Sequence, residues 1–220
     1  MSPDGRFRAT ADRDGGMQVW HVLTSMCVGR RAGGSPVRAL AFDGSARWLA
    51  GAIGEIDSVV LVRAFTGDLG LAWSRRHGTV HFSGSGDPWG YPDEEREGLA
   101  LAVAWCSDGA VVSVGEGEEA GVWDAATGAR LATHEVDGWT HTTAVAASPA
   151  GWIVTGDARG GVRLFAPRVR MPVDQAAIGA EIRTITIGAD DLVTLTTADG
   201  VAHAREVRDR RLVSAARPAR

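Results

Sequence analysis

The sequence of 220 residues predicts an all-β protein built from repeated four-stranded units. Short apolar runs alternate with turn residues, and the clearest series is Leu101–Trp105, Ala110–Val114, Gly121–Asp124 and Leu131–Thr133. Apolar runs of this length, bounded by Gly, Asp and Ser, are typical of strands in one antiparallel sheet. The chain shows essentially no apolar pattern of helical period that would compete with this interpretation.

The same turn chemistry recurs along the chain at Ser2–Gly5, Phe42–Ser45, Ser107–Gly109, Ser148–Gly151 and Gly188–Asp191. Three of the intervals are close to about 40 residues, which is a period typical of repeat architectures, and one interval is longer by about 20 residues. A second marker, a Thr followed by Ser or Gly, keeps the same phase. It stands at Thr24, Thr66 and Thr127. Two markers in phase indicate a true internal repeat.

Three segments resemble WD-repeats. Pro36–Gly44 and Val145–Pro149 resemble the opening of such a repeat, and Val122–Asp124 carries the Trp-Asp pair that ends it. The resemblance covers nearly the whole chain and implies a β-propeller of four-stranded antiparallel blades around a central axis. Thr66–Trp73 is instead similar to the repeats of quinoprotein-like propellers, which are the alternative family.

The units depart from the WD-repeat pattern at its polar positions. Gly33–Gly34 stands where the family has a Gly-His pair, and Gly117 and Arg159 stand where it has a structural Asp. We therefore expect the buried hydrogen-bond network typical of the family to be mostly missing. Apolar packing and ladder hydrogen bonds would then hold the blades together.

The chain is expected to form one propeller region, residues 1–220. The expected blades cover about 1–31, 35–76, 98–137, 138–178 and 179–218, with a loop insertion at 77–98. The first blade lacks its innermost strand, because almost nothing precedes the Ser2–Gly5 turn that normally follows that strand. We expect a C-terminal fragment of a larger propeller of about seven blades; the alternatives are closure as a small or irregular propeller, or a homodimer through the open end.

The insertion is expected to share one end of the blades with the loops between second and third strands. Carboxylates gather there, and they are Asp12, Asp14, Glu55, Asp57, Glu116, Glu118, Glu119, Asp157 and Asp199 in the loops and Asp93, Glu94, Glu95 and Glu97 in the insertion. We interpret this end as an acidic face for a basic protein or peptide partner. Trp89 and Tyr91 would anchor that partner, and Glu94, Glu95 and Glu97 would supply charge. A solvated loop face is the alternative, because Asp and Gly are common turn residues.

Other candidate chemistry is weak. His77 and His81, with Asp87 as a third ligand, lie on a Gly/Ser-rich segment that does not aim the two rings at one ion, so no metal site is expected. Gly115–Ala120 matches a dinucleotide fingerprint, but no helix follows it and its glutamates would repel a pyrophosphate, so no cofactor is expected. The remaining histidines are expected in packing or at edges. They are His21, His134, His141 and His203.

These observations favour a non-catalytic scaffold that binds a protein or peptide partner. The alternative is an enzyme or cofactor-binding propeller, quinoprotein-like or hydrolytic, with its site at the central channel. The net charge of −4 argues against a nucleic-acid binder. No apolar run is long enough to cross a membrane, and no signal sequence opens the chain, so a cytoplasmic protein is expected. Cys27 and Cys106 are expected as buried free thiols, and the Arg-rich segment 205–220 as protection for an edge strand.

Overall fold

The computed structural model describes residues 1–54, 59–64, 69–77, 79–82, 94–97, 99–106, 108–116, 119–136, 141–166, 169–188 and 190–214. These residues form strands and turns and contain no helix. The strands make one three-stranded sheet, four four-stranded sheets and one separate pair. The predicted all-β architecture of repeated antiparallel sheets is confirmed.

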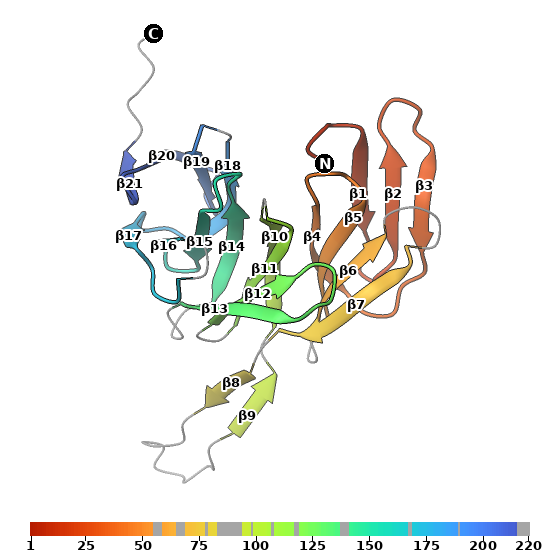
Figure 1. Ribbon diagram of the computed structural model, residues 1–220, viewed down its shortest axis with the longest axis horizontal. Helices are drawn as coiled ribbons and strands as arrows, with labels where there is room; N and C mark the ends of the chain where they lie inside the picture. Colours follow the sequence, from red (N-terminus) through yellow and green to blue (C-terminus); the bar gives the residue numbers. More distant parts are fainter. Residues whose placement is uncertain are drawn as a thin grey trace.

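Each blade is a meander whose strands pair in chain order (Figure 1). Blade one contains β1 (Phe7–Ala11), β2 (Met17–His21) and β3 (Cys27–Arg31), and blade two contains β4 (Val37–Phe42), β5 (Trp48–Ile53), β6 (Val59–Ala64) and β7 (Leu71–Arg76). Blade three contains β10 (Ala100–Trp105), β11 (Ala110–Gly115), β12 (Glu119–Asp124) and β13 (Arg130–Glu135). Blade four contains β14 (Thr142–Ala147), β15 (Ile153–Asp157), β16 (Gly161–Phe165) and β17 (Asp174–Ala177). Blade five contains β18 (Ile182–Ile187), β19 (Leu192–Thr197), β20 (Ala202–Arg208) and β21 (Arg211–Ser214).

The three strands of blade one correspond to the second, third and fourth strands of the other blades. The turn between β2 and β3 has hydrogen bonds from His21 N to Met26 O (2.9 Å) and from Ser25 N to His21 O (2.8 Å). The turn between the third and fourth strands of blade three has the same pattern, from Asp124 N to Ala129 O and from Gly128 N to Asp124 O, both at 2.8 Å. The innermost strand is therefore the one that blade one lacks, as predicted.

A β-bulge marks the same place in each complete blade. The register between the first and second strands shifts at Val37/Ala39, Ala100/Ala102, Thr142/Ala144 and Ile182/Thr184. A bulge adds one residue to one strand and increases the local right-handed twist. The repeat seen in the sequence is thus a repeat of backbone geometry as well.

The blades pack face to face along an arc, with the inner strands β4, β10, β14 and β18 as neighbours and blades one and five at its two ends (Figure 1). Each of the four boundaries between consecutive blades has its own apolar cluster. The middle strands are covered on both faces: every residue of β11 is buried, with Val111 facing blade two and Val112 facing blade four. A strand covered on both faces needs an almost continuous apolar run, which explains the sequence of this segment.

The two ends of the blades differ in their connections. The end that we call the turn end carries the short turns after each first and third strand. The opposite end, the loop end, carries the connections after each second and fourth strand. Hydrogen bonds tie these connections together at the loop end, from Glu116 N to Leu99 O (2.9 Å) and from Ala158 N to His141 O (3.0 Å).

The insertion after β7 contains an antiparallel pair at the loop end, where the sequence had predicted a loop. β8 (Thr79–Phe82) pairs with β9 (Glu94–Glu97) in a register that sets Thr79 opposite Glu97 and Phe82 opposite Glu94. The pair stands away from the blades (Figure 1). The alternation of Thr, Val, His and Phe in β8 is a strand pattern, but it is too short to have outweighed the Gly-rich segment around it.

Candidate functional site

The boundary between blades two and three concentrates the polar and aromatic contacts of the fold. Trp73 on β7 donates its indole N–H to Ala125 O of blade three at 2.7 Å. Arg75 on the same strand donates from Nε to Gly128 O and from Nη2 to Thr127 O, each at 3.1 Å. The outer strand of blade two therefore holds the turn between β12 and β13 through three charged or polar hydrogen bonds.

A buried polar network lies in the core of the same boundary. Nδ1 of His77 is 2.9 Å from Oγ of Ser113, and the indole N–H of Trp123 donates to the same oxygen at 2.8 Å. Because an indole N–H can only donate, the hydroxyl of Ser113 keeps its proton available for Nδ1 of a neutral His77. Burial, and then the charge of Arg130, lower the pKa of His77 to about 4.

This network bears on two expectations from the sequence. The network expected to be mostly missing is present in part in blade three, where His77, Ser113 and Trp123 form it and Gly117 stands in place of the structural Asp. From the sequence, a metal site at His77 and His81 is considered but not expected; in the structure, His77 is buried and bonded to Ser113. The side chain of His81 and the whole of Asp87 lie outside what the structure describes. Across the described residues, no group of three or more His, Cys, Asp or Glu side chains could hold a metal ion.

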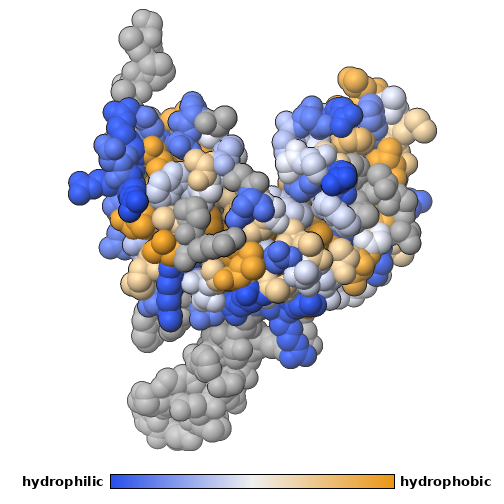
Figure 2. All heavy atoms as spheres, viewed as in Figure 1, coloured by the Kyte–Doolittle hydropathy of each residue, from blue (hydrophilic) through white to orange (hydrophobic). Residues whose placement is uncertain are grey.

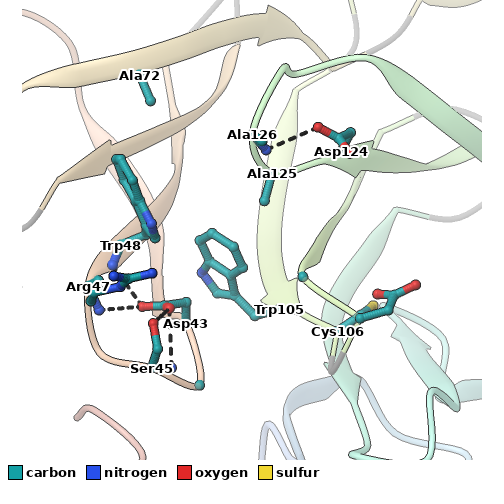
Figure 3. A pocket seen from close by; sticks show the side chains of 13 residues that line it. Asp43, Ser45, Arg47, Trp48, Ala72, Trp105, Cys106, Asp124, Ala125 and Ala126 are labelled. Atoms are coloured by element: carbon teal, nitrogen blue, oxygen red, sulfur yellow. Dashed lines mark hydrogen bonds between the residues drawn. The ribbon is translucent and has the colours of Figure 1, made fainter.

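The turn end of the boundary is hollowed by a cavity of about 700 Å³ (Figure 3). Blade two contributes Asp43 and Arg47 from the turn before β5 and Trp48 from the first position of β5, and blade three contributes the end of β10 and the turns that follow. Both indole rings, of Trp48 and Trp105, point into the space between the blades (Figure 3). This is the concave, partly aromatic kind of surface that binding sites use.

Local hydrogen bonds fix the walls of the cavity. Asp43 is buried and accepts from the backbone N–H groups of Arg47 and Trp48 at 2.7 Å through Oδ1. Its other oxygen accepts from the N–H and the hydroxyl of Ser45. Trp105 donates its indole N–H to Ala41 O of blade two at 2.8 Å, which fixes the ring across the boundary. The site is thus set by rigid strand ends and a closed turn.

Carboxylates and a neutral thiol complete the cavity. Asp124 is ionised, because a hydrogen bond from the Thr127 hydroxyl, and then one from the Thr127 N–H, lower the pKa of its carboxyl. Burial, and then the charge of Asp108, raise the pKa of Cys106 to about 12, so this thiol stays protonated. The expectation of two buried thiols is wrong, because Cys106 is only half-buried and Cys27 is exposed on the edge strand β3.

Exposed apolar side chains gather at the turn end. They are Met1, Val22, Leu23, Met26, Trp48, Leu71 and Leu192, whereas Leu131 lies within β13, Val169 and Met171 lie beside the last residues of β13, and Val201 is at the loop end. The most exposed of them, Leu23 at 87%, is at the tip of the turn between β2 and β3, where hydrophobic atoms are visible (Figure 2). The same view shows a notch between the N-terminal and C-terminal blades (Figure 2). The sequence did not reveal this clustering, because the residues come from turns far apart in the chain.

The acidic residues predicted at the loop end have mixed roles. Asp12 accepts from Gly16 N at 2.6 Å, and Asp199 accepts from the Thr197 hydroxyl at 2.5 Å, so both stabilise turns. Asp157 is buried and pairs with Arg163 at 2.9 Å, and Glu119 pairs with Arg130 at 2.8 Å. These contacts give the named carboxylates structural roles that need no partner.

The predicted partner residues fall on the insertion. Trp89 and Tyr91 lie outside the described residues. Glu94, Glu95 and Glu97 are on β9, where they pair with Phe82, His81 and Thr79 of β8, respectively. Their role in binding stays a prediction.

Comparison with known proteins identifies the fold. No protein-family model and no curated protein matches the chain. The beta-propeller domain of Cps50 (Swd1) from Myceliophteria thermophila is similar with a TM-score of 0.69 and 14% identity, over 100% of this chain and 66% of that one. The computationally designed Ika8 protein is similar with a TM-score of 0.66 and 19% identity, over 90% of this chain and 55% of that one. The chain thus spans about two thirds of the first protein's length and just over half of the second's.

Likeness at these identities shows the fold and nothing finer. Because 1343 chains of solved structures match, the architecture is a widespread one that hosts many functions. No helix that could span a membrane occurs in the described part of the chain. The protein has a β-propeller fold, in which blade one has three strands and blades two to five have four each.

Proposed function

We propose that this protein is a non-catalytic interaction scaffold of the WD-repeat type, which binds a protein or peptide partner on the turn end of its propeller. The observation that carries the proposal is the set of exposed apolar side chains at the turn end, the end that also holds the cavity between blades two and three. Aromatic side chains and Met are enriched at the cores of protein interfaces, and Trp is the commonest kind of hot spot.

Two further features support this kind of scaffold. Val22, Leu23 and Met26 are exposed together on the turn between β2 and β3, and exposed apolar side chains that lie together mark interaction sites. The turns that carry them are held by strand ends and side-chain hydrogen bonds, so the surface is already formed before a partner binds. The WD-repeat type is supported by the Trp-Asp pair at Trp123–Asp124 and by the buried His77 and Ser113 behind it.

A random peptide library displayed on phage and selected on the immobilised protein would test the proposal. We expect binders that are lost with Trp48→Asp and kept with Val201→Asp. Both changes place a carboxylate on an exposed apolar site, 37% exposed for Trp48 at the turn end and 48% for Val201 at the loop end. Far-UV circular dichroism and melting curves would show that both variants are folded. Selection of binders that tolerate Trp48→Asp and fail with Val201→Asp would place the partner on the opposite end and refute the proposal.

A further inference from the structure

The chemistry of the cavity between blades two and three indicates which side chain a partner presents there. We infer that the cavity binds a basic side chain, arginine foremost, between the indole rings of Trp48 and Trp105, with Asp108 and Asp124 as counter-charges. This inference rests on the proposed function and specifies the partner: a peptide segment with a basic residue at its anchor position.

The aromatic walls favour a cation. A guanidinium or ammonium group over the face of Trp is attracted by the negative potential of the ring, and Trp is the best aromatic residue for this contact. Trp105 is fixed in place by its hydrogen bond to Ala41 O, and Trp48 enters the cavity from the first position of β5 while 37% exposed. Arginine suits two such rings better than lysine, because its planar guanidinium stacks on aromatic faces and is more weakly hydrated.

The charges favour a cation as well. Three hydrogen bonds converge on Oδ1 of Asp124, from Ala126 N (3.1 Å), Thr127 N (2.7 Å) and the Thr127 hydroxyl (2.8 Å). They leave Oδ2 without a hydrogen bond from the described residues. Asp108 lines the cavity with an exposed side chain. The charge of Asp108 also contributes to the raised pKa of Cys106, which places this thiol in a negative local potential.

One basic residue, Arg47, also lines the cavity. Its backbone N–H is held by Asp43 at 2.7 Å, and its side chain is exposed on the blade-two side. The carboxylates of Asp108 and Asp124 come from blade three and outnumber this single charge. If Arg47 were the recognising group, the cavity would instead take an anion, and a variant can separate the two.

The test uses N-acetyl-arginine amide as the probe and N-acetyl-citrulline amide as its neutral isostere. Indole N–H resonances of the ¹⁵N-labelled protein, assigned by Trp48→Phe and Trp105→Phe, report binding at each wall. We expect saturable, millimolar binding of the arginine probe that shifts both signals, and binding of the citrulline probe that is about ten-fold weaker or absent. The lysine analogue is expected to bind more weakly than arginine.

The variants separate the contributions. Asp108→Asn and Asp124→Asn should each weaken binding of the arginine probe about three-fold, the typical effect of one exposed charge pair. Trp48→Ala should abolish measurable binding. Arg47→Gln should strengthen it, because a like charge is removed. Leu192→Asp, also at the turn end and also 37% exposed at the wild-type residue, should leave the affinity unchanged.

Three outcomes would overturn the inference. Equal affinity for the arginine and citrulline probes would mean that the positive charge of the probe does not contribute to binding. Loss of binding with Arg47→Gln, together with binding of N-acetyl-glutamate amide, would mean that the cavity takes an anion. Indole signals that do not move with any basic probe would mean that the cavity is not a site for such a side chain. In the last case, peptides that still depend on Trp48 would leave the proposed function standing, so the two failures are distinguishable.

Discussion

Nδ1 of His77 lies 2.9 Å from Oγ of Ser113, so the residue that directly follows blade two is anchored in the core of blade three. The same serine oxygen accepts the indole N–H of Trp123. The insertion that contains β8 and β9 begins immediately after His77. The hydrogen bond therefore fixes the point at which the chain leaves the propeller, whatever the insertion itself does.

The pKa of His77 gives the fold a dependence on pH. Its folded value of about 4 is below the ordinary 6.5, so the unfolded chain takes up a proton below pH 6.5 that the folded chain cannot hold. The contribution of neutral His77 to the free energy of unfolding is therefore fully present above pH 6.5. It falls by about 1.4 kcal/mol per pH unit as the pH drops, to a loss of about 3 kcal/mol near pH 4. Urea unfolding at a series of pH values from about 7 down to about 4.5 would measure this slope.

The variant His77→Asn is the control for this pH dependence. Its amide oxygen offers an acceptor to Ser113 and does not titrate. We expect a shallower slope in the variant, with a remainder from His134, whose pKa is also lowered by burial. A slope equal to that of the wild type would show that His77 does not account for the acid sensitivity.

Removal of the Ser113 hydroxyl should lower the free energy of unfolding, whereas removal of the equivalent Thr155 hydroxyl in blade four should not. Ser113→Ala leaves the buried indole N–H of Trp123 without its acceptor, which costs about 2–3 kcal/mol. Thr155 occupies the equivalent position in blade four. Ser113 pairs with Gly121, two residues before Trp123. In the same way, Thr155 pairs with Arg163, two residues before Phe165.

The hydroxyl of Thr155 is buried and has no hydrogen-bond partner among the described residues. Thr155→Val, which keeps the shape, should therefore leave the free energy of unfolding unchanged or raise it slightly. Chemical denaturation of both variants measures the contrast. Equal losses in the two blades would mean that the network in blade three contributes nothing beyond packing.

The sequence predicted the blades because each one repeats local chemistry. Turn residues such as Asp43 and Gly128 and apolar runs such as Ala110–Val114 are read from neighbours in the chain. The His77 network was missed because the insertion separates this residue from the first strand of blade three, where the family pattern has its histidine. His77 directly follows β7, as Val136 directly follows β13, so both occupy the same position after the fourth strand of a blade. Aligning the units by the ends of their fourth strands, instead of by the starts of their first strands, could have identified His77 as the histidine of blade three.

The cavity could not be predicted for a different reason. Trp48 and Trp105 are in different repeats, and each alone has the pattern of an ordinary strand end. Only the packing of blade two against blade three brings the two rings to one space. The exposure of Cys27 likewise depends on β3 being the outer strand of its sheet.

The turn between β12 and β13 should depend on the absence of a side chain at Gly128. Its φ is +69°, and a Cβ there would lie 2.7 Å from the ring of Trp73. Gly128→Ala should destabilise the protein by about 1 kcal/mol through backbone strain and by about 1–3 kcal/mol more through displacement of Trp73. Gly109→Ala is the matched control, because Gly109 has a φ of +80° and a Cβ there would meet no atom within 4 Å. Equal losses of unfolding free energy in the two variants would show that Trp73 is not packed on this turn.

The acidic residues of β9 offer the test of the loop end. Glu94, Glu95 and Glu97 belong to a strand pair that stands away from the blades, so replacing all three with Arg should leave the melting temperature of the propeller nearly unchanged (Figure 1). If a basic partner docks on this pair, the charge reversal should weaken its capture at least ten-fold, because like charges then meet and association loses its electrostatic steering. Replacement with Gln is the control, since it removes charge without reversing it and should give an intermediate loss that shrinks at high salt. A partner captured equally by the wild type and the Arg variant would exclude these glutamates from the interface, and the turn end would then be the remaining candidate surface.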